Sequence, residues 1–310
     1  MNTDFNYSSV ASLIQAAEKN NLPVSALVLS QQAQQIELDE KTVYEKMASN
    51  FQVMKECIEP GCDEHLKSTS GLTGGDAFKL RRYSESGKSL TDSFLSGALY
   101  RALAVSELNA SMGRIVAAPT AGSCGILPAA LITMQEEKGC SDHDCVMALF
   151  TASAVGMVIA NNASLAGAQG GCQAECGSAA AMAAAAITEL AGGTPHMVSQ
   201  AVAIALKNIL GLVCDPVAGL VEIPCIKRNA SGVVGAFVAA EMALAGIDSA
   251  IPADEVIWSM KRIGDVMSPT LKETAEGGLA ATPTGRKLHD QVFGPGNVSG
   301  GCSGCSGCHS

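Results

Sequence analysis

Residues 160–190 read ANNASLAGAQGGCQAECGSAAAMAAAAITEL, a glycine-punctuated stretch with two cysteines that leads into a run of alanines. Alanine is the strongest helix former, and small side chains let neighbouring helices pack closely. The pattern returns in GLVCDPVAGLVEIPCIKRNASG, residues 211–232, which precedes an apolar helix expected over 233–245. No stretch shows the period of two that indicates a half-buried strand. The sequence therefore predicts an all-α fold, a single helical domain with Gly-rich loops.

Helical patterns also flank this stretch. Near the N-terminus, apolar residues recur at steps of three and four and predict a helix with one apolar face; they are Val43, Met47, Phe51, Met54 and Ile58. Further helices are expected over residues 92–108 and 197–210. We divide the chain into an N-terminal helical docking segment (1–60), a catalytic helical domain (61–295) and a Cys-rich tail predicted to be flexible (296–310).

The composition disfavours several classes of protein. With 310 residues, 47% of them hydrophobic, the chain is long enough to bury a sizeable core. The formal net charge of −10 disfavours a nucleic-acid partner, because phosphate binding needs clustered Lys and Arg. The opening MNTDFNYSSV lacks the basic and apolar regions of a signal peptide. The most apolar stretches, 146–160 and 179–186, are short, so we expect buried helices and no membrane span.

Twelve cysteines without a secretory signal indicate a reducing compartment, by default the cytoplasm, and metal or redox chemistry rather than disulfides. Four lie in or beside helical patterns and are predicted to be buried structural residues: Cys57, Cys62, Cys140 and Cys145. Four others stand where a helix meets a turn, where thiolates can converge near free backbone N–H groups: Cys172, Cys176, Cys214 and Cys225. Spacing alone leaves a metal site and ordinary buried cysteines equally open.

The last three cysteines, Cys302, Cys305 and Cys308, follow one another at C-x2-C-x2-C spacing, with His309 adjacent. This spacing suits zinc, copper or a ferredoxin-like cluster. Three interpretations stay open: a separate metal-binding tail, a thiolate donor to the main site, and a solvated tail with reactive thiols.

Five segments carry a resemblance to a known family. They are STSGLTGGDAFKL, APTAGSCGILPA, ANNASLAGAQGGCQAECGSA, GLVCDPVAGLVEIPCIKRNASG and LHDQVFG, in this order between residues 68 and 294. Together they resemble the alpha chain of the iron-sulfur-dependent L-serine dehydratases. The resemblance implies a helical lyase chain that converts L-serine to pyruvate and ammonia with a separate beta chain as partner.

In that family Gly-rich loops converge on a 4Fe-4S cluster held by three cysteines, which the resemblance places at Cys172, Cys214 and Cys225. Cys176 is then a neighbour. Three thiolates leave one of four irons open, and an open iron can act as a Lewis acid for the hydroxyl and carboxylate of the substrate. The tail supplies possible fourth ligands, which would protect or inhibit the cluster when substrate is absent: Cys302, Cys305 and Cys308.

A buried substrate carboxylate needs hydroxyl and backbone N–H donors. Two predicted hydroxyl-rich loops, residues 68–75 and 119–125, and the stretch just before Cys172 supply such groups. Our candidate substrate-binding residues there are Ser68, Thr69, Ser70, Thr73, Gly74, Thr120, Gly122, Ser123, Asn161, Asn162 and Ser164. The same residue types also form turns and helix caps, and that alternative stays open. Lys227 and Arg228, beside a ligand candidate, and more weakly Lys79, are candidates to offset the charge of the cluster or substrate.

No residue stands out as the general base. The histidines are isolated in sequence, and a lone histidine is more often structural or exposed than catalytic; those considered are His65, His143, His196 and His289. We therefore expect the base to come from the beta chain.

Three alternatives to the serine dehydratase assignment are weighed. A pyridoxal-phosphate dehydratase would need a phosphate-cradling glycine loop after a strand, and TSGLTGG has no strand before it. An iron-sulfur scaffold or carrier would explain the Cys-rich tail but not the hydroxyl-rich loops. A cluster dehydratase for L-threonine or another hydroxy acid stays open, because one methyl group changes discrimination by only about 1–3 kcal/mol.

Overall fold

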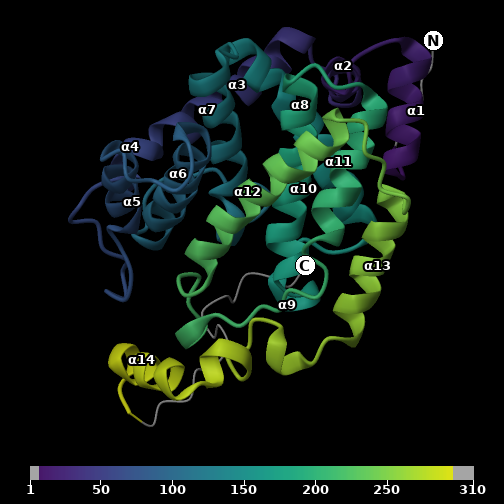
Figure 1. Ribbon diagram of the computed structural model, residues 1–310. Coiled ribbons are helices and arrows are strands. Elements are labelled where there is room, and N and C mark those ends of the chain that lie inside the picture. The colour runs from purple at the N-terminus through teal and green to yellow at the C-terminus, as the bar shows by residue number, and fades with distance from the viewer. Residues whose placement is uncertain (1–6, 296–310) are drawn as a thin grey trace.

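The computed structural model describes residues 7–295 as a bundle of helices (Figure 1). Within these residues there is no β-strand, which confirms the predicted all-α class. The α-helices are α1 (Val10–Asn20), α2 (Val24–Gln35), α3 (Glu40–Glu56), α4 (Ile58–Gly61), α5 (Asp76–Glu85), α6 (Ser93–Ala110), α7 (Ile126–Lys138), α8 (Asp142–Asn162), α9 (Gly167–Gly170), α10 (Cys172–Leu190), α11 (Pro195–Lys207), α12 (Cys225–Leu244), α13 (Ala253–Val266) and α14 (Pro283–Phe293).

Helix α10 forms the centre of the bundle and packs against α7, α8, α11 and α12 (Figure 1). The run of alanines predicted to be helical forms most of it, and every residue from Cys176 to Thr188 is buried. Small side chains on all sides let four helices approach one axis, and this closeness places the N-terminus of α10 inside the molecule.

The predicted N-terminal helical pattern resolves into α1, α2 and α3. The apolar stripe predicted on the last of these is buried at Val43, Phe51 and Met54, and both α2 and α3 pack against α8. One apolar core contains residues from Val10 to Met260, so the N-terminal helices share it with the central bundle. The boundary at residue 60 stays a prediction.

Helix α8 is long and apolar enough to cross a membrane by length and composition alone. However, 67% of its most apolar window is buried inside the bundle, where it packs against α2, α3 and α10. This burial gives its hydrophobicity a structural explanation within the fold.

One predicted boundary is wrong. We expected a turn up to residue 232 and a helix from 233, whereas α12 begins at Cys225. Gly232 lies inside the helix, where a Cβ atom would come within 2.5 Å of Ile126 Cδ1, so this glycine permits close helix packing and not a turn. The early start brings Cys225 to the first turn of a long helix.

After α13 the chain runs back beneath the bundle toward α14, which lies at the lower edge in Figure 1. On the way it pairs with the loop between α11 and α12. Cys214 donates its backbone N–H to Leu271 O at 2.8 Å, and Glu273 donates to Cys214 O at 2.9 Å. This pairing fixes the backbone of Cys214 from both sides.

Candidate active site

Two of the cysteines begin long helices. Cys172 is the first residue of α10 and Cys225 is the first residue of α12, and both side chains are buried. A helix N-terminus presents backbone N–H groups without intrahelical partners and the positive end of the helix dipole. The helix terminus thus favours a negative charge on sulfur at both positions, a contribution that burial of the thiols opposes.

The turn before Cys172 requires glycine. Gly171 has a φ of 77°, and a Cβ atom there would lie 2.7 Å from Met267 Sδ and 2.9 Å from Leu212 O. The buried Gln173 side chain donates to the carbonyl oxygens of Gly170 and Met260, both at 3.0 Å. These contacts hold α9, α10 and α13 together around the first turn of α10.

Cys214 reaches the same place from a loop. Its Sγ lies against the short helix α9, because a Cβ atom on Gly167 would be 2.9 Å from this sulfur and 3.4 Å from the Glu273 carboxylate. Burial raises the pKa of the Cys214 thiol, and charges on Glu273 and Cys172 raise it further. Burial also raises the pKa of Cys225 to about 12, with a further contribution from Cys172. The three thiols therefore lie within electrostatic reach of one another.

Cys172 differs from the other two. A hydrogen bond with the Cys176 thiol lowers the pKa of Cys172, and the Arg228 guanidinium lowers it further. The same hydrogen bond, together with burial, raises the pKa of Cys176. Cys176 thus acts as a neutral neighbour that supports the charge on Cys172.

The remaining described cysteines are not part of this group. Of the four cysteines predicted to be buried structural residues, Cys57, Cys62 and Cys145 are buried, whereas Cys140 is only half-buried, so the prediction is wrong for Cys140. Cys124, which belongs to none of the groups defined from the sequence, is buried in the loop before α7. The tail cysteines Cys302, Cys305 and Cys308 lie outside the described residues.

The predicted loop at 119–125 meets the first turn of α10. Thr120 donates its hydroxyl to Glu175 Oε1 and lies 3.0 Å from the Ser123 hydroxyl. The backbone of Gly122 lies against the same carboxylate, since a Cβ atom there would be 2.6 Å from Glu175 Oε1. All three predicted residues of this loop therefore come together around Glu175.

Asn229 ties that loop to α12. It donates to Gly122 O at 2.7 Å and to Cys225 O at 3.0 Å, and it accepts from the Gly125 N–H at 2.9 Å. The side chain is fully buried and its amide is satisfied on both ends. It fixes the distance between the 119–125 loop and the helix that begins at Cys225.

The loop at 68–75 meets the segment just before Cys225. Ser70 and Thr73 both donate their hydroxyls to Glu222 Oε2, at 2.9 and 2.8 Å. Ser68 lies 3.1 Å from the Ser70 hydroxyl. Glu222 is buried, so this carboxylate holds the loop against α12.

The other two candidates of this loop have backbone roles. Thr69 donates its N–H to Ala110 O at 3.0 Å. Gly74 has a φ of 134°, and a Cβ atom there would be 2.1 Å from Leu66 O. The loop thus brings hydroxyl groups next to the cysteine segment, while Thr69 and Gly74 set its shape.

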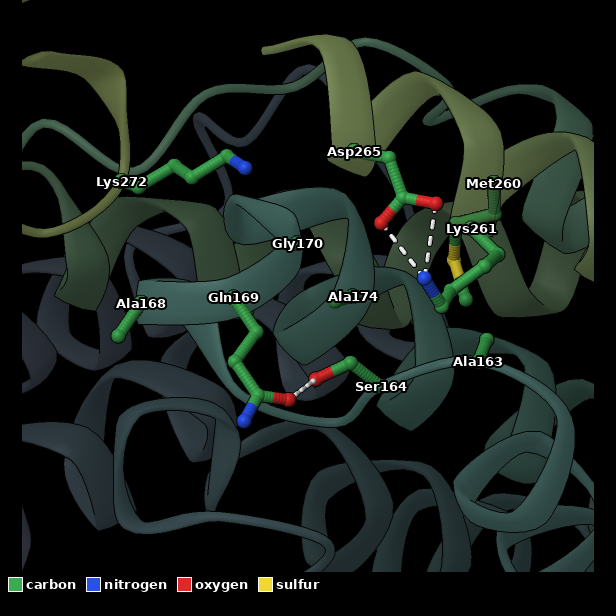
Figure 2. A pocket seen from close by; sticks show the side chains of 10 residues that line it. All are labelled: Ala163, Ser164, Ala168, Gln169, Gly170, Ala174, Met260, Lys261, Asp265 and Lys272. Atoms are coloured by element: carbon green, nitrogen blue, oxygen red, sulfur yellow. Dashed lines mark hydrogen bonds and ion pairs between the residues drawn. The ribbon is translucent and has the colours of Figure 1, made fainter. Parts of the chain in front are cut away.

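The third group of candidates lies elsewhere. Asn162 donates to Ser8 O and Val158 O, both at 2.8 Å, and so joins the N-terminal segment to α8. Ser164 donates to Gln169 Oε1 at 2.7 Å in a pocket of about 290 Å³ beside α9 (Figure 2). The structure does not bring Asn161, Asn162 or Ser164 into contact with the two hydroxyl-rich loops. Lys261, Asp265 and Lys272 line the opposite side of this pocket.

The candidate cations have carboxylate partners. Lys227 donates to Asp76 Oδ2 at 2.6 Å, and Lys79 pairs with the same carboxylate. Arg228 is held by Val213 O and by Asp215, which also accepts from the Leu279 N–H. Arg228 alone has a charge that acts on Cys172 and Cys225.

The histidines considered from the sequence do not converge on the thiols. His143 lies 3.2 Å from the Tyr44 hydroxyl, and His196 lies 3.1 Å from Asp248. His289 contacts Phe293 on α14. None of the described contacts joins a histidine to the cysteine group.

Single metal ions and clusters place different demands on their ligands. Among residues 7–295, no group of three or more His, Cys, Asp or Glu side chains is arranged to hold one metal ion. An iron-sulfur cluster is bound by cysteine thiolates attached to different irons, so its ligands lie further apart than those of a single ion. Cys172, Cys214 and Cys225 are buried free thiols, the ligand type that such a cluster binds.

Sequence reasoning did not identify three polar residues that organise this site. Glu175, Glu222 and Asn229 link the loops to the cysteine-bearing helices. The sequence did hold a signal for Glu175, because it is the first acidic residue in an otherwise apolar helix and lies between Cys172 and Cys176. Charged residues are almost never buried without a partner or a role.

Taken together, the fold and the site define an all-α enzyme whose buried thiols meet hydroxyl-bearing loops at helix N-termini. The family model described as serine dehydratase alpha chain matches residues 19–280. The chain is 50% identical to the probable L-serine dehydratase alpha chain of Bacillus subtilis over 288 aligned residues. The alignment covers 93% of this chain and 96% of that relative.

Two further relatives agree. The L-serine dehydratase alpha chain of Peptoniphilus asaccharolyticus is 42% identical, over 89% of this chain and 94% of the relative. The longer L-serine dehydratase TdcG of Escherichia coli is 37% identical over 89% of this chain and 62% of its own length. The chain belongs to the serine dehydratase alpha chain family and is an enzyme of the lyase type.

Proposed function

We propose that this chain is the alpha subunit of an enzyme that converts L-serine to pyruvate and ammonia. The convergence of three buried thiols with two hydroxyl-rich loops carries the proposal, because the reaction needs both a Lewis acid and donors for a carboxylate. The names of the relatives in Bacillus subtilis and Peptoniphilus asaccharolyticus support the choice of substrate.

Cys172, Cys214 and Cys225 are the residues that would hold a 4Fe-4S cluster. When bound, the cluster would supply an iron without a protein thiolate, which polarises the hydroxyl of the substrate and makes it a better leaving group. The Cys172 thiolate is supported by the helix N-terminus, the Cys176 thiol and Arg228. Cys302, Cys305 and Cys308 remain possible fourth ligands.

The two hydroxyl-rich loops orient the substrate. Backbone N–H groups of these loops, and the Ser123 hydroxyl once it turns from Thr120, can donate to the substrate carboxylate, while the Ser70 and Thr73 hydroxyls stay engaged by Glu222. The network through Asn229 keeps these donors at a fixed distance from α12. Orientation of this kind lowers the entropy cost of reaching the transition state.

The overall chemistry removes the α-proton and the hydroxyl of L-serine as water. The resulting aminoacrylate tautomerises to an imine, and water hydrolyses the imine to pyruvate and ammonia. We assign the base that takes the α-proton to the beta chain. The relative from Escherichia coli, which extends well beyond the matched region, is consistent with a second catalytic part in the family.

We place the active enzyme in the cytoplasm as a complex of alpha and beta chains. The nine described cysteines are all free thiols, and iron-sulfur ligands need a reducing environment to remain so.

Anaerobic reconstitution with iron and sulfide, followed by a pyruvate assay with and without the beta chain, tests the proposal. We expect a brown protein that forms pyruvate from L-serine when both chains are present. A colourless protein, or turnover of L-threonine in preference to L-serine, would refute the cofactor or the substrate respectively.

A further inference from the structure

We infer that Glu175 binds the ammonium group of the substrate. The inference rests on the proposed function, because it concerns how an α-amino acid is recognised at the thiol site. It deepens that proposal by naming the side chain that distinguishes an amino acid from the corresponding hydroxy acid.

Glu175 occupies a central position in the site. It lies one turn along α10 from Cys172, and its charge contributes to the pKa values of the Cys172, Cys214 and Cys225 thiols. Its side chain is half-buried, whereas all three thiols are buried. The carboxylate therefore lies within electrostatic reach of the thiols, in a side chain that the protein does not fully enclose.

The carboxylate is held in place but not saturated. Thr120 donates to Oε1, and within residues 7–295 no hydrogen bond to Oε2 is found. Gly122 lies flat against the group, since a Cβ atom there would be 2.6 Å from Oε1 and 2.9 Å from Oε2. One oxygen is thus positioned by the protein while the other keeps its acceptor capacity for a ligand.

Glu175 supplies the negatively charged acceptor that the two loops lack. Backbone N–H groups of the loops can donate to a carboxylate, but an ammonium group has three donors and needs acceptors. A buried cation without a paired anion is costly, so an amino-acid site requires a carboxylate at this position.

The other carboxylates around the site are either bound by protein donors or exposed to water. Glu222 accepts from Ser70 and Thr73. Asp215 is paired with Arg228 and accepts from the Leu279 N–H. Glu273 lies near Cys214 but on an exposed loop position, where water competes for its charge.

Ligand selectivity tests this assignment directly. The reconstituted alpha chain would be titrated with L-serine and with L-glycerate, which carries a hydroxyl in place of the ammonium group. The beta chain, to which we assign the base, is left out so that L-serine binds without reacting. Calorimetry gives both affinities without requiring turnover. In Glu175→Gln we expect the affinity for L-serine to fall by about 10- to 100-fold, the range for a hydrogen bond to a charged group, with that for L-glycerate unchanged.

Two control variants separate recognition from folding. Glu189→Gln alters the other half-buried carboxylate near an end of the same helix and should leave both affinities unchanged. Gly122→Ala should displace the Glu175 carboxylate and weaken L-serine binding selectively, while Gly235→Ala, which meets no atom within 4 Å, should not. Iron content and the thermal unfolding midpoint are measured for each variant. If Glu175→Gln does not fold, the Gly122→Ala variant tests whether Glu175 binds the ammonium group.

The outcomes distinguish the inference from the proposed function. Equal loss of both ligands in Glu175→Gln and Gly122→Ala, or no loss of either, would overturn the role of Glu175. Failure of the unaltered complex to form pyruvate would overturn the proposed reaction, yet the binding titrations would still report whether Glu175 selects amino acids.

Discussion

Helix α10 carries two carboxylates near its two ends, and the protein treats them differently. Burial raises the pKa of both Glu175 and Glu189. Glu189 accepts from the Ser25 N–H at 3.1 Å and from the Thr151 hydroxyl at 3.0 Å, so both of its oxygens are used within the protein. Glu175 accepts from Thr120 and faces a group of thiols.

The contrast separates a structural from a functional acid on one helix. Glu189 fastens α2 and α8 to the C-terminal end of α10, where every partner is a protein donor. Glu175 lies at the end where α10 meets loops with hydroxyls and cysteines. Changes at the thiol end should therefore alter chemistry, and changes at the other end should alter stability.

The largest effect is expected from replacing a cysteine at the thiol end. Cys225→Ser should remove a cluster ligand and lower activity by about 100-fold or more. This loss exceeds the one expected when a residue that only hydrogen-bonds to a metal ligand is replaced. Iron content and pyruvate formation measure it. Cys145→Ser, which changes a buried cysteine outside the site, serves as control. An equal loss of activity in both variants would contradict the assignment of Cys225 as a cluster ligand.

The next largest effect should come from Asn229. Asn229→Ala leaves the Gly125 N–H and the Gly122 carbonyl without their buried partner, and each unsatisfied group costs about 1–3 kcal/mol. We expect a lower free energy of unfolding in urea together with reduced activity, because the loop at 119–125 is released. Unchanged unfolding would show that water replaces the amide.

A smaller effect, confined to a pH interval, is expected at Glu189. Since the pKa of Glu189 is raised by burial, the native state holds its proton at pH values where the unfolded state has lost it. The free energy of unfolding therefore falls as pH rises from the usual carboxyl range, about 4.3, through the raised value.

Glu189→Gln removes this titration while it keeps one acceptor oxygen. Urea unfolding of both proteins across the acidic range should show a flatter pH dependence for the variant, with activity unchanged. A difference between the two proteins that does not vary with pH would contradict the account of Glu189.

The smallest effect is expected at Lys227. This residue lies two positions after Cys225, but its ammonium group is paired with Asp76 near the surface. Exposed ion pairs contribute about 0–1 kcal/mol, so Lys227→Ala should change the free energy of unfolding and the activity only slightly. A large loss of activity would give Lys227 the role in offsetting cluster or substrate charge considered from the sequence.

The sequence predicted the helical class because its signal is local. Alanine content, the absence of period-two alternation and glycine-marked turns all act within short windows, and α6, α10 and α11 lie close to their predicted ranges. The start of α12 was wrong, because Gly232 reads as a turn residue when its packing partner Ile126 is unknown.

The site was less accessible to sequence reasoning because it depends on distant contacts. Hydroxyl-rich loops were identifiable by composition, yet their anchors Glu222, Glu175 and Asn229 act across up to 152 positions of the chain. Asn162 has the residue type of a binding group, but its partners are main-chain oxygens of Ser8 and Val158. Only the fold determines which polar residue meets which loop.

The central claim is that the N-terminal ends of α10 and α12 bind a cluster that meets the substrate directly. Mössbauer spectroscopy of the alpha chain, reconstituted anaerobically with 57Fe and combined with the beta chain, tests it most directly. Addition of L-serine should change the signal of one iron site and leave the others as they were, because three cysteines leave one iron open. A spectrum that L-serine does not alter, or iron retained after Cys172, Cys214 and Cys225 are all replaced, would contradict the account.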